Sequence, residues 1–154
     1  MDPTTHQFPK TMKSLFKKLL STQNSPQVID ASLLVFRVAV GLSIINTHGW
    51  NKLVDFEGNT AHIPDPFGLG GATNVVIAIV ADIVFAGFVV AGFLTRFSAL
   101  VVLQVTLVGL LVVHINDPWK VKDVPLMYSL AFSLIMVLGA GKYSVDHWLF
   151  HSKK

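Results

Sequence analysis

The chain has 154 residues, of which 52% are apolar and only 14% are charged, with a net charge of +3 and no cysteine. Because an ordinary soluble domain carries roughly a quarter charged residues, this composition argues against a soluble globular protein. The lack of cysteine excludes a disulfide, a thiolate nucleophile and an iron–sulfur cluster held by this chain alone. The length allows one domain.

Residues 1–28 are predicted to form a cytoplasmic N-terminal segment. Within it, apolar residues recur at helical spacing and lysines lie largely away from them, which predicts a short amphipathic helix on the anionic cytoplasmic leaflet. The alternative is a frayed basic tail. The apolar residues are Met12, Leu15, Phe16, Leu19 and Leu20, and the lysines are Lys10, Lys13, Lys17 and Lys18. No A-x-A cleavage site follows the first apolar run, so that run is predicted to be retained as a helix.

Four stretches almost free of charge come next, at residues 31–47, 72–95, 97–113 and 124–141. Each is near the roughly 20 residues that cross about 30 Å of hydrocarbon as a helix. Lipid offers no hydrogen bonds, so the backbone must satisfy itself and these stretches should be helical. The predicted fold class is an all-α membrane protein, a bundle of four transmembrane helices with a short interfacial helix before it. A soluble all-helical protein is the alternative, but four such stretches would leave it no solvent-facing surface.

The connections between these stretches differ in length and charge. Residues 49–71 are predicted to form a long outer loop, residues 93–96 a tight turn, and residues 116–123 a second outer loop. The side with both termini carries eight basic residues and the other side three, so both termini are predicted to be cytoplasmic, in a bacterial inner membrane. The eight are Lys10, Lys13, Lys17, Lys18, Arg96, Lys142, Lys153 and Lys154; the three are Lys52, Lys120 and Lys122. These flanks account for the positive charge, so nucleic acid is not predicted as a partner.

Three polar side chains interrupt the apolar stretches, namely Arg37, Asp82 and Gln104. An arginine or aspartate at a helix centre costs about 2.5–3.5 kcal/mol on insertion scales. Counted from the outer helix ends, all three lie roughly 15 Å deep. This predicts a polar core in which Arg37 and Asp82 form an ion pair near Gln104. The alternative is that Arg37 reaches inward to the head groups.

A second group of polar residues gathers at the outer helix ends. It comprises His48, Lys52, His114, Asp117 and Tyr128. Histidine, lysine, acid and tyrosine at one membrane face could bind a polar head group, shuttle protons or hold a metal. No spacing among them specifies a metal, and none is predicted. The alternative is that these are ordinary residues of the membrane interface.

Five segments, in order, resemble the DoxX family of integral membrane proteins. The second resembles the loop of its Bacteroidetes-type members, and together the segments span about residues 35–149. Two positions depart from the family, which usually has glutamate where this chain has Asp82 and often where it has Asp123. The segments are FRVAVG at 36–41 with THGWNKL at 47–53, IPDPFGLG at 63–70, GFLTR at 92–96, HINDPW at 114–119, and GAGKYSVD at 139–146.

The resemblance implies a DoxX-like four-helix membrane domain over residues 29–149, followed by a basic tail at 150–154. Related proteins include the small membrane subunit of a thiosulfate:quinone oxidoreductase, and other members are linked to redox stress. The leading hypothesis is therefore a membrane component of a quinone- or thiol-linked redox system, with quinone as the leading cofactor. A soluble or membrane redox protein would be its partner, besides the lipid bilayer. The resemblance assigns no catalysis to the isolated chain.

Two other functions are weighed against this hypothesis. The first is a non-catalytic scaffold that anchors a soluble enzyme through the basic ends or the outer loop. The second is a small-molecule permease, which is disfavoured because no predicted span is broken by proline or unwound by paired glycines in its middle.

Overall fold

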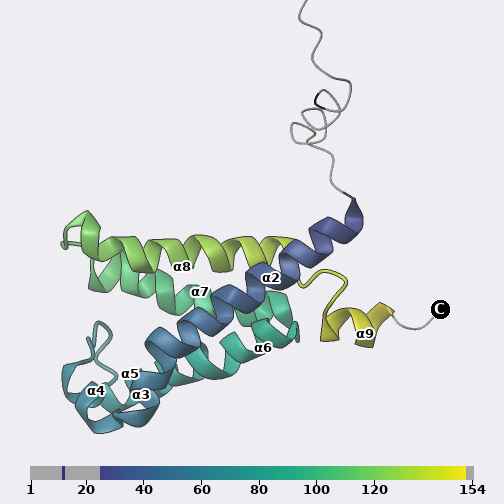
Figure 1. Ribbon diagram of the computed structural model, residues 1–154. Coiled ribbons are helices and arrows are strands. Elements are labelled where there is room, and N and C mark those ends of the chain that lie inside the picture. Colours follow the sequence, from purple (N-terminus) through teal and green to yellow (C-terminus); the bar gives the residue numbers. More distant parts are fainter. Residues whose placement is uncertain (1–11, 13–24, 152–154) are drawn as a thin grey trace, which may run out of the picture.

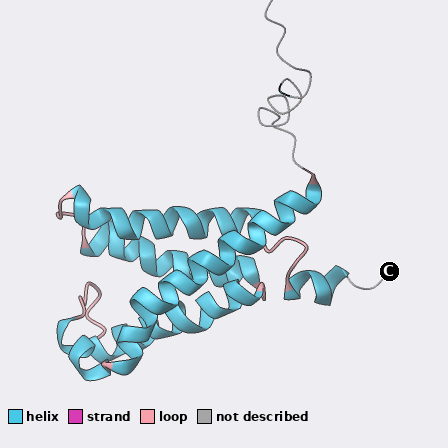
Figure 2. Cartoon of the chain, in the orientation of Figure 1, coloured by secondary structure: helices cyan, strands magenta, loops and turns pink. Residues whose placement is uncertain are grey.

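The structure is a computed structural model that describes residue 12 and residues 25–151. Every regular element in these residues is a helix (Figures 1 and 2). The predicted all-α fold class is confirmed. The predicted amphipathic helix at residues 12–20 falls, apart from Met12, outside the described residues.

Four helical spans are long and apolar enough to cross a membrane. The first is Pro26–Val54, built from α2 (Pro26–Ile44), the π-helix η1 (Ile45–Gly49) and α3 (Trp50–Val54). The second is Gly71–Ala91, built from α5 (Gly71–Ile79), η2 (Val80–Phe85) and α6 (Ala86–Ala91). The third is Thr95–Val113, built from α7 (Thr95–Val108) and η3 (Gly109–Val113), and the fourth is α8 (Trp119–Leu138). The protein is a multi-pass membrane protein.

The first and fourth helices extend further into the two outer loops than predicted. The first span continues to Val54, and α4 (Phe56–His62) occupies part of the predicted loop 49–71. The Asp55 side chain begins α4 by accepting a hydrogen bond from Gly58 N at 3.1 Å, as an N-cap residue does. The second loop is shorter because α8 already starts at Trp119, after Pro118.

The spans form two helix pairs that diverge toward one end. Helices α7 and α8 run side by side, and α2 packs against α6. Figure 1 shows the pairs close together near α6 and separated near α3, α4 and the α7–α8 connection. We call that separated end the loop end. The opposite end, with residue 25, the α6–α7 turn and α9 (Val145–His151), is the terminal end.

The apolar core lies between the terminal end and the middle of the bundle. Its side chains are nearly or fully buried and come from all four spans. We call this set the apolar layer: Ile44, Ala86, Val89, Ala99, Val102, Leu103, Phe132 and Ile135. The large apolar residues on the outside of the spans remain exposed, as expected for a surface that faces lipid.

The C-terminal segment is fastened across the terminal end by polar contacts, some of them partly buried. The guanidinium of Arg37, a residue that is only 2% exposed, donates hydrogen bonds to the carbonyls of Ala140 and Tyr143. The carboxylate of Asp146 accepts from Leu94 N at 2.7 Å and Thr95 N at 2.9 Å, which satisfies backbone donors at the start of α7. These contacts position α9 beside the α6–α7 turn.

Candidate ligand cavity at the loop end

A cavity of about 700 Å³ lies between the two helix pairs toward the loop end. All four spans contribute to its walls, which are mainly apolar, and the loop between α4 and α5 borders it through Ile63, Pro64, Pro66, Phe67 and Leu69. Its polar lining residues are His48, Lys52, Asn74, Asp82, Gln104, Thr106, His114 and Tyr128. The size and the few convergent polar groups are typical of a small-molecule site.

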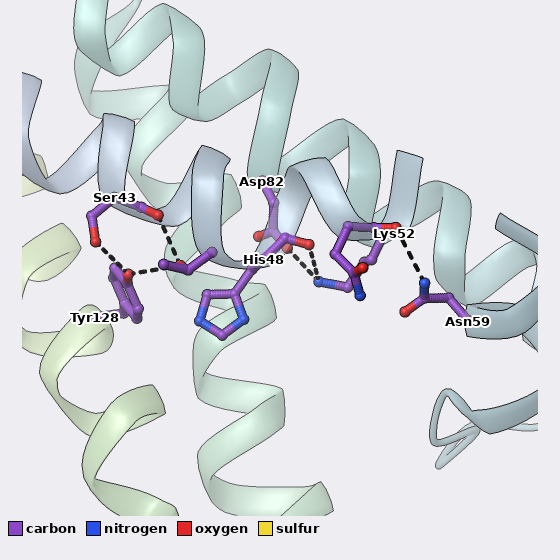
Figure 3. Close-up of polar contacts among 8 residues, drawn as sticks. Ser43, His48, Lys52, Asn59, Asp82 and Tyr128 are labelled. Atoms are coloured by element: carbon purple, nitrogen blue, oxygen red, sulfur yellow. Dashed lines mark hydrogen bonds and ion pairs between the residues drawn. The ribbon is translucent and has the colours of Figure 1, made fainter. Parts of the chain in front are cut away.

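An ion pair between Lys52 and Asp82 lies at the wall of this cavity (Figure 3). The distance from Lys52 Nζ to Asp82 Oδ2 is 2.9 Å, and the same Nζ donates to the His48 carbonyl at 3.0 Å. The two side chains are 19% and 4% exposed. Because an isolated charge is costly away from water, this pairing is what allows both residues to stay in the span.

The predicted ion pair between Arg37 and Asp82 is wrong. Arg37 lies at the terminal end against the carbonyls of Ala140 and Tyr143, whereas Asp82 pairs with Lys52. The sequence-based depth was counted from His48 as the end of the first helix, but that helix continues to Val54. Arg37 is therefore about 25 Å from the end of its span, roughly 10 Å deeper than the count placed it.

A close approach of the first two spans brings Lys52 within reach of Asp82. Gly49 lies against the backbone of η2, where an added Cβ would stand 3.0 Å from the Asp82 carbonyl oxygen and 2.6 Å from a side-chain carbon of Ile83. Any larger residue at this position would push the helices apart. The glycine therefore sets the distance across which the lysine reaches the carboxylate.

Each of the first three spans contains a π-helical turn beside the cavity. His48 is part of η1 and Asp82 is part of η2, while η3 ends directly before His114. A π turn adds a residue to one helical turn and re-aims the side chains that follow, and such turns often occur at functional sites. None was predicted, because no local residue pattern in the sequence announces them.

Tyr128 reaches the cavity from α8 and contacts the first span. Its hydroxyl is 2.8 Å from Ser43 Oγ and 3.2 Å from Thr47 Oγ1, and either partner can donate in each contact. Its ring meets the His48 ring edge-on, with 5.4 Å between centroids. Figure 3 shows His48 between Tyr128 and Lys52. The His48 ring nitrogens form no hydrogen bond with any described residue, so they can serve a ligand.

His114 borders the cavity near the α7–α8 connection. Its Nδ1 is 2.7 Å from Asp117 Oδ2, and the Asp117 side chain is 46% exposed. Asp117 does not line the cavity itself. The structure thus brings His48, Lys52, His114 and Tyr128 to one cavity. Asp117 lies outside the cavity, where it contacts His114 and is exposed to water.

Asp82 and Gln104 also line this cavity, whereas their depth in the sequence predicted a separate polar core with Arg37. The sequence placed Lys52 outside the membrane because the first helix was predicted to end at His48. That Lys52 lies at the same depth as Asp82 and Gln104 follows only once the helix is known to continue to Val54. Among residues 25–151, no three histidine or acidic side chains are grouped so that they could hold a metal ion.

The loop that borders the cavity is held by Asp65. Its carboxylate accepts from Asn74 Nδ2 at 2.8 Å, from Leu69 N at 2.8 Å and from Gly70 N at 2.9 Å. These hydrogen bonds, the one from Asn74 first, lower the pKa of Asp65 below its ordinary value near 3.8. The loop is therefore fastened by this carboxylate at neutral pH, and the contribution is lost only as the pH falls through the lowered pKa.

The chain is similar to a known family of proteins over its first three spans. The DoxX family model matches residues 32–115, more than half of the chain. The chain belongs to the DoxX family. The match covers most of the first span and the whole of the second and third, and so includes Lys52, Asp82 and His114; α8 with Tyr128 lies beyond it.

Two relatives of this DoxX protein extend the comparison beyond the matched domain. An uncharacterized protein of Haemophilus influenzae is 30% identical over 122 residues, which cover 75% of this chain and 81% of the relative. The inner membrane protein YqjF of Escherichia coli is 29% identical over 126 residues, covering 78% of this chain and 93% of the relative. No solved structure matches the chain.

Proposed function

We propose that this DoxX protein is a membrane component of a redox system that binds a quinone head group in the loop-end cavity. The observation that carries the proposal is an ion pair, Lys52–Asp82, at the wall of a largely apolar cavity of about 700 Å³ in the membrane-spanning region. A quinone has carbonyl oxygens that accept hydrogen bonds and an apolar tail that prefers lipid. The cavity has polar groups within mainly apolar walls, and the outer faces of the spans carry exposed apolar side chains.

Free hydrogen-bonding groups in the cavity suit a carbonyl head group. A lysine ammonium has three N–H donors, and Lys52 uses two of them for Asp82 and the His48 carbonyl. The third remains for a ligand. The Gln104 amide and the His48 ring nitrogens form no hydrogen bonds with described residues and line the same space. Asp82 would hold the ammonium in position and balance its charge.

The surroundings of the cavity suggest how the proposed redox protein is oriented. His114 and Asp117 link the cavity to the loop end, where histidine and acid can exchange protons with water. The basic flanks favour a cytoplasmic terminal end, in a bacterial inner membrane like that of the relative YqjF. Since the chain has no cysteine for thiol or iron–sulfur chemistry, we propose that a soluble or membrane redox partner supplies or removes the electrons.

A short-chain quinone analogue should stabilise the purified wild-type protein against heat. The gain should rise with ligand concentration by mass action, reaching about 2.7 kcal/mol at a hundred times Kd. His48→Ala and Gln104→Leu should each weaken binding by about tenfold, the equivalent of one hydrogen bond. Melting curves over a ligand titration measure both effects.

The control for this titration is Arg96→Gln, which changes an exposed arginine at the terminal end and should leave the affinity unchanged. If no quinone stabilises the wild type, the quinone proposal fails. Stoichiometric co-purification of a soluble enzyme without any small molecule would then favour the scaffold function instead.

A further inference from the structure

The loop-end cavity is closed toward the terminal end by the apolar layer. On the second span and on α8, the residues of this layer lie between the cavity residues and the terminal end of the helix. On the first span Ile44 lines the cavity itself, and on the third span Ala99 lies on the terminal side of the cavity residue Val101. Val89 follows Asp82 on the second span, and Ile135 follows Tyr128 on α8. The members of each pair are seven positions apart along the helix, which corresponds to about 10 Å.

The apolar layer contains no group that could carry a proton. Its eight side chains are aliphatic or phenylalanine, and each is at most 6% exposed. The next charged side chain beyond it on the first span is Arg37, which is bound to the carbonyls of Ala140 and Tyr143. A head group or a hydrated proton would have to cross this dry layer to reach the terminal end, and its desolvation would oppose that.

The opposite side of the cavity is polar and reaches water. His114 lines the cavity and bonds Asp117, whose side chain is nearly half exposed. The proton-bearing groups that face the cavity are His48 and Lys52 from the first span, Asp82 from the second, His114 beyond the third and Tyr128 from α8. All of them lie on the loop-end side of the apolar layer.

We propose that the cavity is open to the aqueous phase at the loop end alone, so that the head group of its ligand is reached, and its protons are exchanged, from that side. This inference rests on the proposed function for the nature of the ligand. A quinone that becomes a quinol gains two electrons and two protons. The electrons come from the redox partner, and both protons enter from the loop end through the side chains around His114 and Lys52. The protein therefore works on its ligand from one face and does not carry it across the membrane.

Single cysteines test this one-sided access, because the native chain has none to give background labelling. Asn116→Cys marks the loop end and Arg96→Cys marks the terminal end. Gln104→Cys places a thiol in the cavity, and Ala99→Cys places one in the apolar layer of the same helix. Each variant is expressed as the full chain and treated with a charged, membrane-impermeant thiol reagent, in intact cells and in inverted membrane vesicles.

Gln104→Cys should react from the same side as Asn116→Cys and not from the side of Arg96→Cys, while Ala99→Cys should react from neither. Should Gln104→Cys fail to fold, Val105→Cys, which also lines the cavity, takes its place. Labelling from the Arg96 side, from both sides, or from neither side would overturn the inference. A short-chain quinone should slow the labelling at position 104; labelling from the loop end without this protection would contradict the ligand of the proposed function but not the one-sided access.

Discussion

Replacing Asp82 with leucine should lower the free energy of unfolding by about 3–5 kcal/mol, because Lys52 would keep a charge in the apolar wall without a partner. Lys52→Met should lower the free energy of unfolding by a similar amount, because the Asp82 carboxylate would then lack its partner. The carboxylate is 4% exposed and the ammonium 19%, so water can replace little of the lost interaction. Unfolding of the purified variants in detergent, followed by circular dichroism, measures both losses.

The double variant Lys52→Met/Asp82→Leu should regain a large part of the lost stability, since it removes both charges together. A matched control combines Lys52→Met with Glu57→Leu, an exposed acid on α4 at the same end, and should give no recovery. Arg37→Leu combined with Asp82→Leu should be additive, because residues of the apolar layer separate these two side chains. Additive losses for Lys52 and Asp82 would show that the pair does not form.

Replacing Arg37 with methionine should release the C-terminal segment from the terminal end. The substitution keeps the apolar stem but leaves the carbonyls of Ala140 and Tyr143 without their charged donor, at a cost of about 1.5–3 kcal/mol for each hydrogen bond. Amide hydrogen exchange across residues 139–151 should become faster by at least tenfold. Exchange in α7 should change less, because Asp146 contacts only its first residues.

The control for Arg37 is again Arg96→Gln, which removes an exposed positive charge at the same end without a buried hydrogen bond. Quinone binding should survive Arg37→Met, since the apolar layer separates this residue from the cavity. A loss of binding as large as that of His48→Ala would mean that the two ends are coupled, and the proposed division into a structural end and a ligand end would fail.

The fold could be predicted from the sequence because the membrane imposes strong and simple constraints. A stretch such as residues 72–95 has too few charges for a soluble helix and the right length for a span, so only one structure suits it. The convergence of His48 and His114 followed from the alternation of spans, which places both at the same end of the bundle. Neither conclusion required knowledge of how side chains pack.

The partners of the buried charges could not be predicted in the same way. Lys52 was assigned to an outer loop, because Gly49 and the polar residues after it resemble the end of a helix, yet the helix continues through them. Gly49 does not end the helix; its lack of a side chain allows the first span to approach the backbone of the second span at Asp82. Arg37 donates hydrogen bonds to carbonyls that lie beyond the fourth span, more than 100 residues away in the chain. No local sequence pattern specifies such a contact.

Photo-crosslinking with a quinone analogue that carries an azide on its ring tests the central claim most directly. If the head group binds beside Lys52 and Asp82, peptide mapping should find crosslinks in residues 44–52, 80–85 and 101–109, with unlabelled quinone competing for them. Gly49→Leu, which should separate the first two spans, should abolish these crosslinks. Crosslinks scattered over the lipid-facing residues, or confined to the terminal end and insensitive to competitor, would contradict a quinone site in this cavity.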